Sequence, residues 1–349
     1  MSVFSHPEYD AHEHVAFHQD PVTGLKAIIA VHSTRLGPGL GGCRMWPYGS
    51  DAEALTDVLR LSRGMTYKAA LAGLPQGGGK SVILGDARKD KTPELMRTMG
   101  RFVNNLAGAY IAAEDSGTSV ADVRLMAQET VHVGGLADAQ AQAEGRTGDP
   151  SPATAYGTFV GLKAAVKFQL GREDLKGLKV AIQGVGNVGY RLARYLHEAG
   201  AQLWVTDIHY PAVDRCVQEF GATAVSMERI FGLEVDVFAP CALGAILNDI
   251  TLPEIKATVI AGAANNQLLQ PRHGQQLLER GILYAPDYAI NAGGIIEIYH
   301  ETHGYDEARA KAHLDRIGDT LTAIFQRSKL ERRPTGAIAD VMAEEIFRR

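Results

Sequence analysis

Two kinds of hydrophobic spacing alternate along the first half of the chain. Apolar residues stand at every second position over residues 25–31, which predicts a strand. After Ser50 they recur at helical spacing, which predicts a helix that begins near Ser50 and carries Met65 and Lys68 on one face. The proline and glutamate that follow Thr92 predict the start of another helix. The first half therefore mixes strands and helices.

The second half follows a regular strand–helix rhythm. A helix is predicted from Ser151 to about Leu170, and short apolar strands separated by helical stretches come after it. The predicted strands cover residues 178–183, 203–206, 235–239, 258–261 and 282–284. This alternation is typical of a doubly wound parallel sheet.

A glycine-rich turn follows the first of these strands. The segment Gly184-Val185-Gly186-Asn187-Val188-Gly189 fits the pattern G-x-G-x-x-G and stands between a strand and a helix, as dinucleotide binding requires. Such glycines allow a tight turn and let a pyrophosphate approach the helix N-terminus. Asp207 ends the next strand, where a carboxylate accepts hydrogen bonds from ribose hydroxyls and repels a 2′-phosphate. The context favours an NAD site over a chance glycine turn.

The length of the chain predicts two domains. At 349 residues it exceeds what one hydrophobic core usually organises. We predict an α/β fold with an N-terminal α/β substrate and oligomerisation domain (residues 1–147), a doubly wound Rossmann NAD domain (residues 148–319), and a cleft between them. The Ala-, Gln- and Gly-rich segment 137–150 is the predicted link, and the helical tail of about 320–349 is expected to pack back on the first domain.

Composition and charge exclude several classes of protein. Hydrophobic residues make up 46% of the chain and charged residues 21%, which is ordinary for a globular protein. The net charge of −5 and the lack of basic runs argue against nucleic acid as a partner. Neither a signal peptide nor a bilayer-spanning apolar run is visible. Three scattered cysteines form no disulfide framework and no zinc spacing, so we expect a cytoplasmic protein without a bound metal.

The candidate chemistry centres on two lysines and one aspartate. Lys68 follows the helix described above, and Lys80 follows the glycine triplet 77–79. A buried lysine near a second cation loses its proton readily, so one lysine can hold an anion while the other acts as a base. Asp115 comes at the end of a short predicted strand, and Ser119 already supplies the next helix cap. The alternative for each lysine is a solvated surface position.

Further loops offer backbone and amide groups. The glycine-rich segment 37–42 is predicted to be a loop whose N–H groups can bind a carboxylate, with a plain tight turn as the alternative. Asn265 and Asn291 follow predicted strands of the second half, and we expect them to face the cofactor or the cleft. The alternative is that each asparagine only forms a turn.

These segments together carry a family resemblance. The motifs are Gly37-Pro38-Gly39-Leu40-Gly41-Gly42-Cys43-Arg44-Met45-Trp46, Arg63-Gly64-Met65-Thr66-Tyr67-Lys68, Gly77-Gly78-Gly79-Lys80, Ala113-Glu114-Asp115, Ser151-Pro152-Ala153-Thr154-Ala155-Tyr156-Gly157, Ala261-Gly262-Ala263-Ala264-Asn265-Asn266-Gln267 and Asn291-Ala292-Gly293-Gly294. The chain resembles the amino-acid dehydrogenases of the glutamate, leucine, phenylalanine and valine group over nearly its whole length, and most closely the leucine branch of that group.

The resemblance implies a reaction and a role for each site residue. It implies NAD-dependent oxidative deamination of an L-amino acid to a 2-oxo acid and ammonium, with Lys80 as general base and Asp115 exchanging protons with the amino group. Lys68 would hold the substrate carboxylate. The implied substrate-binding residues are Leu40, Gly41, Gly42, Met65, Ala113, Asn265, Ile295 and Ile298. The implied cofactor-binding residues are Thr154, Gly184, Gly186, Asn187, Val188, Gly189, Asp207, Ala239, Cys241, Ala261 and Asn291.

Substrate choice is implied by the side-chain pocket. Glutamate enzymes of the group carry a lysine where Leu40 stands, so a glutamate side chain would be buried here without a partner. Leucine, isoleucine and valine are therefore the expected substrates, and phenylalanine is the alternative on the same scaffold. Glu297 departs from the neutral polar residue of the leucine enzymes. The C-terminus is shorter than theirs, so we expect a homo-oligomer between a dimer and an octamer.

Two other classes of function remain as alternatives. The first is a non-catalytic NAD-binding regulator on the same fold, against which the retention of Lys68, Lys80 and Asp115 argues. The second is an unrelated NAD-linked 2-hydroxy-acid dehydrogenase. That chemistry typically uses a histidine acid–base group with an arginine clamp, which is a different set of residues.

Overall fold

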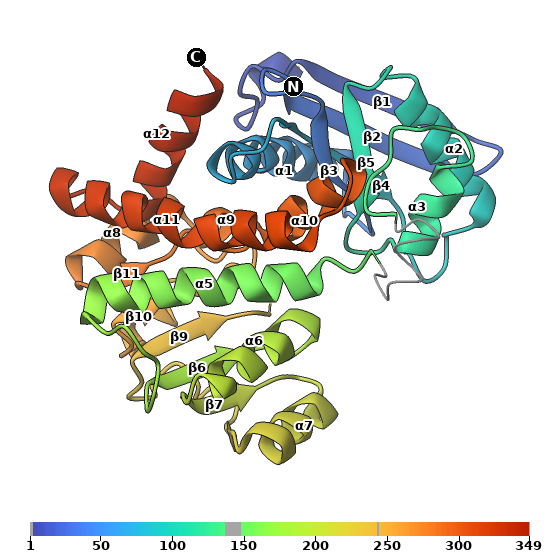
Figure 1. The fold of residues 1–349 in the computed structure, drawn as a ribbon. Helices are drawn as coiled ribbons and strands as arrows, with labels where there is room; N and C mark the ends of the chain where they lie inside the picture. Colours follow the sequence, from blue (N-terminus) through green and yellow to red (C-terminus); the bar gives the residue numbers. More distant parts are fainter. Residues whose placement is uncertain (1–2, 137–147, 243, 349) are drawn as a thin grey trace. The chain divides into compact units, whose positions relative to one another are not determined.

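The computed structural model describes residues 3–136, 148–242 and 244–348 (Figure 1). The chain divides into two compact units. Unit 1 comprises Met1–Asp149, Ile298–Tyr305 and Ala343–Arg349, and unit 2 comprises Pro150–Glu297 and Asp306–Met342. Most of the predicted link, residues 137–147, lies outside the described residues. The C-terminal tail divides between the units, because residues up to Met342 belong to unit 2 and only those from Ala343 onward belong to unit 1.

Unit 1 is built on a five-stranded mixed sheet with the strand order β1-β2-β4-β3-β5. The strands are β1 (His14–Asp20), β2 (Leu25–Ser33), β3 (Gly39–Trp46), β4 (Gly77–Leu84) and β5 (Tyr110–Glu114). β2 pairs antiparallel with β1 and β4, whereas β3 runs parallel to both β4 and β5. The carboxyl ends of β3, β4 and β5 therefore lie at one edge of the sheet.

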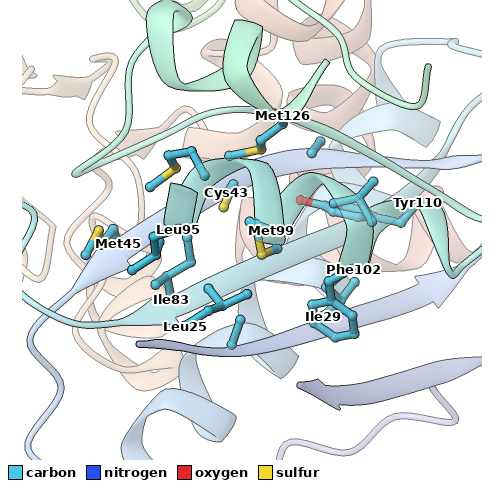
Figure 2. Packing of buried hydrophobic residues seen from close by; sticks show 14 of the residues in the cluster. Leu25, Ile29, Cys43, Met45, Ile83, Leu95, Met99, Phe102, Tyr110 and Met126 are labelled. Atoms are coloured by element: carbon cyan, nitrogen blue, oxygen red, sulfur yellow. The ribbon is translucent and has the colours of Figure 1, made fainter. Parts of the chain in front are cut away.

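Helices cover both faces of this sheet. They are α1 (Asp51–Leu71), α2 (Pro93–Asn104) and α3 (Val120–Met126), with a short 3-10 helix at Val3–Ser5. On one face, apolar residues of α2 and α3 pack on β2–β5 in the main core cluster, in which Figure 2 shows Met99 and Phe102. On the other face, Val58 and Leu59 of α1 pack with Ile28 and Val82. α1 is thereby fixed along the sheet, and it carries Lys68.

Side-chain caps begin these helices at the predicted residues. The Ser50 hydroxyl accepts a hydrogen bond from Glu53 N at the start of α1, and Thr92 does the same for Leu95 N at the start of α2. Ser119 forms a capping box with Asp122 at the start of α3. The three predicted helix starts are confirmed.

The prediction of a glycine loop over residues 37–42 is wrong from Gly39 onward, because those residues belong to β3. Glycine is required there by close packing and not by a turn. A Cβ on Gly41 would lie 1.8 Å from the carbonyl oxygen of Gly79, and a Cβ on Gly79 would lie 2.6 Å from the ring of Tyr110. A Cβ on Gly78 would lie 2.0 Å from the backbone nitrogen of Thr66 in α1. The glycines let α1 and three strands approach one another.

Unit 2 is built on a six-stranded sheet in which every pairing is parallel, with the order β11-β10-β9-β6-β7-β8. The strands are β6 (Lys179–Gln183), β7 (Gln202–Thr206), β8 (Thr223–Ala224), β9 (Val237–Pro240), β10 (Val259–Ile260) and β11 (Leu283–Tyr284). Five of them overlap the predicted strands, so the predicted α/β fold with a doubly wound parallel sheet is confirmed.

The helices of unit 2 surround this sheet in sequence order. They are α5 (Ser151–Leu170), α6 (Asn187–Glu198), α7 (Tyr210–Phe220), α8 (Pro271–Glu279), α9 (Asp287–Ile290), α10 (Gly293–Thr302), α11 (Glu307–Glu331) and α12 (Thr335–Phe347), with a 3-10 turn at Leu252–Glu254. α10 and α12 continue into unit 1 at their C-terminal ends. Across the described residues, every helix is too short or too polar to cross a membrane.

Candidate active site

Lys80 and Asp115 meet at the edge of the unit 1 sheet. The Nζ atom of Lys80, on β4, contacts Oδ2 of Asp115, the residue directly after β5. The Lys80 side chain is 8% exposed and that of Asp115 is 15% exposed. The two residues, 35 positions apart in the chain, therefore form a largely buried ion pair.

Burial lowers the pKa of Lys80 to about 7, and repulsion by Arg44 and Lys68 adds to this effect. Asp57 and the Cys43 thiol act in the opposite direction. The contact with Asp115 also favours the ammonium form. We hold to the downward direction because the amine is fully removed from water and faces two cations. An amine in this state exchanges its proton near neutral pH.

Both carboxylate oxygens of Asp115 have partners. Oδ2 binds Lys80, whereas Oδ1 accepts a hydrogen bond from Ser116 N and lies 3.6 Å from the guanidinium of Arg44. The Asp115 backbone N–H donates to the Thr118 hydroxyl, which in turn donates to Cys43 O on β3. These contacts hold the carboxylate against the strand ends.

Two glycines bring the backbone of β3 close to these groups. A Cβ on Gly42 would lie 2.6 Å from Cβ of Asp115, and one on Gly41 would lie 3.4 Å from the Met65 side chain of α1. The β3–β4 pairing joins Leu40 to Gly78 and Cys43 to Ser81 and passes over the two glycines between them. Lys68 completes the group, since its charge acts on Lys80. The structure thus gathers Lys68, Lys80, Asp115 and both glycines, as the sequence predicts.

An apolar wall lies along the same strands. The buried side chain of Leu40 precedes Gly41 on β3, and Ala113 pairs with Gly42 from β5. A Cβ built on Gly134 would lie 3.7 Å from Leu40 Cδ1, 3.6 Å from Ile111 Cγ2 and 3.2 Å from Ile298 Cγ2. Gly134 therefore borders the wall formed by Leu40, Ile111 and Ile298. Sequence analysis missed Gly134 because it follows β5 in an irregular segment with no motif.

Sequence analysis also missed a set of polar residues behind Asp115. Arg44 on β3 binds Asp57 of α1, and the Tyr48 hydroxyl donates to the same Asp57 oxygen. Arg44 stands in a strand that is otherwise apolar or glycine, and this isolated charge is the signal that marks it in the sequence.

The turn after β6 fits a dinucleotide. Gly184 has φ +93°, and a Cβ there would lie 2.7 Å from Ala242 N, while a Cβ on Gly189 would lie 2.0 Å from Gly184 O. A Cβ on Gly186 would instead meet no described atom within 4 Å. Gly186 caps α6 without a side-chain hydrogen bond and no acidic residue stands in the first turn, so the first N–H groups of α6 suit a pyrophosphate. Asn187 and Val188 form that turn.

Asp207 borders this turn. It directly follows β7, and its Oδ2 accepts a hydrogen bond from Val185 N over 2.7 Å. The carboxylate is thereby held beside the glycine turn, where the sequence predicts contact with a ribose.

Two asparagines form a linked pair at another part of unit 2. Asn291 donates from Nδ2 to Asn265 Oδ1 over 2.7 Å and to Ala263 O over 3.0 Å. Its own Oδ1 is buried and has no hydrogen-bond partner among the described residues. A buried acceptor without a partner suits a carboxamide such as that of nicotinamide. The other predicted members of this site differ in exposure: the side chains of Ala239 and Ala261 are fully buried, and the Thr154 hydroxyl donates to Pro150 O.

The cysteines do not supply nucleophiles. Burial raises the pKa of Cys43 and of Cys216 to about 11 and that of Cys241 to about 12, so all three are thiols at neutral pH. Within residues 3–136, 148–242 and 244–348, we find no group of three or more His, Cys, Asp or Glu placed to hold a metal ion.

A hollow of about 670 Å³ in unit 2 lies away from all these residues. Its lining includes Thr258 and Ile282, which directly precede β10 and β11, so it is at the amino ends of the strands. Ligands of such sheets bind at the carboxyl ends. Its cation Arg280 donates to the carbonyl oxygens of Leu252 and Ile255 and so holds the adjoining turn.

A glycine-turn parallel sheet and a buried lysine–aspartate pair are the parts of a nicotinamide-dependent dehydrogenase. The family model "Glu/Leu/Phe/Val dehydrogenase, dimerisation domain" matches residues 9–132, and the model "Glutamate/Leucine/Phenylalanine/Valine dehydrogenase" matches residues 145–208 and 205–329. The chain belongs to this family of amino-acid dehydrogenases, as its motifs indicate.

Three relatives illustrate the range of the family. A leucine dehydrogenase of Geobacillus stearothermophilus is 54% identical over 99% of this chain and 93% of its own length. An L-tryptophan dehydrogenase of Nostoc punctiforme is 46% identical, and its crystal structure matches with a TM-score of 0.83 over 97% of this chain and 96% of that chain. A phenylalanine dehydrogenase of Bacillus thermotolerans is 46% identical over 97% of this chain and 88% of its own length.

Proposed function

We propose that this enzyme catalyses the reversible, NAD-dependent oxidative deamination of branched-chain L-amino acids, with leucine, isoleucine and valine as substrates. An L-amino acid, NAD⁺ and water give a 2-oxo acid, ammonium, NADH and a proton. The observation that carries the proposal is the buried Lys80–Asp115 pair with the apolar Leu40 two residues from Gly42 on the same strand.

Binding of the amino acid is assigned to α1 and β3. The Lys68 ammonium pairs with the α-carboxylate, and the backbone N–H groups at Gly41 and Gly42 assist it. The side chain extends along Leu40, Met65, Ala113 and Ile298. An aliphatic chain suits this wall, because a glutamate carboxylate would be buried there without a cation.

Proton transfer is assigned to Lys80 and Asp115. When bound, the nicotinamide accepts the hydride from the substrate Cα, which leaves an imino carbon. Lys80, as the neutral amine, takes a proton from the water that attacks this carbon. Asp115 exchanges protons with the amino group until it leaves as ammonia. A pKa near 7 suits Lys80 to both directions of transfer.

The residues of unit 2 are assigned to NAD. The N–H groups of the Gly184–Gly189 turn face the pyrophosphate, and the Asp207 carboxylate accepts from the ribose hydroxyls. Asn291 accepts from the carboxamide through its buried Oδ1. The remaining assignments are Thr154, Ala239, Cys241 and Ala261 beside the cofactor, and Asn265 and Ile295 beside the substrate.

Phenylalanine is the second candidate substrate. Gly134 favours it, because the missing side chain leaves room where Leu40, Ile111 and Ile298 converge. The relatives named for phenylalanine and tryptophan are nearly as similar to this chain as those named for leucine.

The test is NADH formation by the purified protein with a panel of L-amino acids that includes leucine, isoleucine, valine, phenylalanine, tryptophan and glutamate, each with NAD and with NADP. We expect the highest kcat/KM with a branched-chain substrate and NAD. A maximum with phenylalanine would retain the chemistry and reject our account of the pocket. If no amino acid is oxidised while NADH still binds, the enzyme assignment of this site fails.

Organisation of the protein forms a further part of the proposal. We assign residues 1–147 to substrate binding and oligomer contacts and residues 148–319 to NAD, in a cytoplasmic homo-oligomer. The match of residues 9–132 to a family model described as a dimerisation domain supports the oligomer. Light scattering across a concentration series should give at least a dimer, and a monomer throughout would reject it.

A further inference from the structure

The guanidinium of Arg44 joins the Asp115 carboxylate to a second carboxylate, that of Asp57. We propose that Arg44, anchored by Asp57, is a positioning residue that fixes Asp115 and keeps Lys80 in its basic form. This inference rests on the roles proposed for Lys80 and Asp115.

The geometry gives Arg44 one contact on each side. Its Nη1 atom lies 2.9 Å from Asp57 Oδ2, and its Nη2 atom lies 3.6 Å from Asp115 Oδ1. Tyr48 donates to the same Asp57 oxygen over 2.6 Å. Asp115 uses its other oxygen for Lys80. A planar, forked guanidinium can span two carboxylates in this way, whereas a lysine ammonium is a single point.

The Arg44 fork is enclosed by the protein. Its side chain is 22% exposed, that of Asp57 is 28% exposed, and the buried Nε atom has no hydrogen-bond partner in the described chain. Leaving a buried N–H group unpaired is unfavourable. The conformation is therefore held by the two carboxylates, and the loss of either partner should release it.

The secondary structure explains why these charges converge. Arg44 and Cys43 come from β3, which pairs with both the strand of Lys80 and the strand that delivers Asp115. Asp57 and Lys68 are about three helical turns apart on α1 and so lie on nearly the same face. α1 thus presents an anion to Arg44 and a cation to the substrate side.

These groups act on Lys80 in opposite directions. Arg44 contributes most after burial to the lowering of the pKa of Lys80, followed by Lys68, whereas Asp57 raises it. Arg44 also draws on the Asp115 carboxylate that would otherwise pair with Lys80 alone. Substitutions of Arg44 and of Asp57 should therefore move the titration of Lys80 in opposite directions.

The experiment measures kcat/KM against pH for the best L-amino acid substrate of the wild-type protein, with NAD saturating. The variants are Arg44→Met, Arg44→Lys and Asp57→Asn in the full-length chain. The acid limb of this profile reports the ionisation of the free enzyme's base. NADH binding, measured by fluorescence, identifies variants that have kept their fold.

Each variant has its own expected result. With Arg44→Met the acid limb should move up by about one pH unit and kcat should fall about tenfold or more, with less effect on KM. Asp57→Asn keeps an acceptor for Arg44 but removes a negative charge, so the limb should move to lower pH. Arg44→Lys keeps the charge, so the limb should stay in place while kcat falls, because an ammonium cannot span both carboxylates.

Arg97 on α2 offers a matched control. Its side chain is 26% exposed and it binds Glu94 over 2.7 Å, so Arg97→Met removes a similar arginine–carboxylate contact from unit 1. This variant should keep both kcat and the position of the limb.

The outcomes separate this inference from the proposed function. An unchanged limb in both Arg44→Met and Asp57→Asn, or movement of both in one direction, overturns the role of Arg44 while the enzyme assignment stands. If Arg44→Met does not bind NADH, the comparison of Arg44→Lys with Asp57→Asn decides. A wild-type protein that oxidises no amino acid overturns both proposals.

Discussion

The chemistry of this protein depends on a lysine whose surroundings oppose its charge. Lys80 is buried in a strand and faces Arg44 and Lys68, yet it also contacts Asp115. Placed at the surface, the same residue would be a permanent cation at neutral pH. Its burial among charges of both signs makes it a base that titrates near pH 7.

Replacing Lys80 by alanine should remove the base. We expect Lys80→Ala to lower kcat by at least about 10²-fold while NADH binding is retained. In the wild type the rate of oxidative deamination should rise with pH through about 7, since only the neutral amine accepts a proton. Lys89→Ala is the control, because Lys89 is 79% exposed and pairs only with Asp86. Near-normal turnover of Lys80→Ala would contradict the assignment.

The size of the substrate should be limited at Gly134. A Cβ there would crowd Ile298 at 3.2 Å and reach Leu40 at 3.7 Å, so Gly134→Ala narrows the apolar wall. We expect kcat/KM to fall about tenfold or more for phenylalanine, less for leucine and least for valine. Gly64→Ala, which introduces the same methyl group where no described atom lies within 4 Å, should leave these ratios unchanged. Equal effects on all three substrates would exclude Gly134 from the pocket.

At the scale of elements, glycines decide how closely helices and strands pack. α1 reaches β4 because Gly78 carries no side chain, and α2 reaches α3 in the same way at Gly100. A Cβ on Gly100 would lie 2.5 Å from the carbonyl oxygen of Met126 and 2.8 Å from its Cα. Backbone atoms cannot move aside as a flexible side chain can, so the helix pair is fixed by this contact.

A pair of glycine-to-alanine substitutions tests this packing. Gly100→Ala should destabilise unit 1 by about 1–3 kcal/mol through overpacking. Gly64→Ala in α1 should stabilise it by about 0.5–1 kcal/mol, because alanine favours the helix and meets nothing. Both changes give the same gain in helix propensity, so their difference isolates the clash. Urea denaturation measures both, and a stabilised Gly100→Ala would contradict the contact.

At the scale of the whole molecule, the two units carry separate reporters and separate tasks. Trp46 lies in unit 1 and Trp204 in unit 2, so fluorescence can follow each unit. Unit 1 also buries His32, which contacts Thr66 through Nδ1 and lies 3.4 Å from Asp10 through Nε2. Burial lowers the pKa of His32 to about 4, with repulsion by His12 adding to the effect.

Acidification should therefore destabilise unit 1. The pKa of His32 is below its unfolded value of about 6.5, so its contribution is intact above pH 6.5 and is lost as the pH falls towards 4, by about 3 kcal/mol in all. In a Trp204→Phe background, the urea midpoint reported by Trp46 should fall over this range. His32→Asn should flatten that slope, whereas His14→Asn, on the exposed part of β1, should not. A slope that is the same in all three proteins would assign the effect to other groups.

Periodicity and caps predicted most elements before any tertiary information. Ser50, Thr92 and Ser119 act within one helical turn, so their signal is local and the predicted helix starts are confirmed. β3 was mistaken for a loop because its glycines answer to crowding by Gly79 and not to the local backbone. Arg44 and Asp57 were missed for the same reason, since their meeting depends on the register of three strands and a helix.

The sequence by itself determined the alternation of strands and helices, the dinucleotide turn and the identity of the acid–base residues. Each of these is written in neighbouring residues, either as a period or as a motif whose chemistry needs those side chains. Tertiary structure alone decided which charges surround Lys80, where Gly134 borders the apolar wall, and how Arg44 joins two carboxylates. Desolvation and Coulomb interactions depend on distances between residues far apart in the chain, and only folding sets those distances.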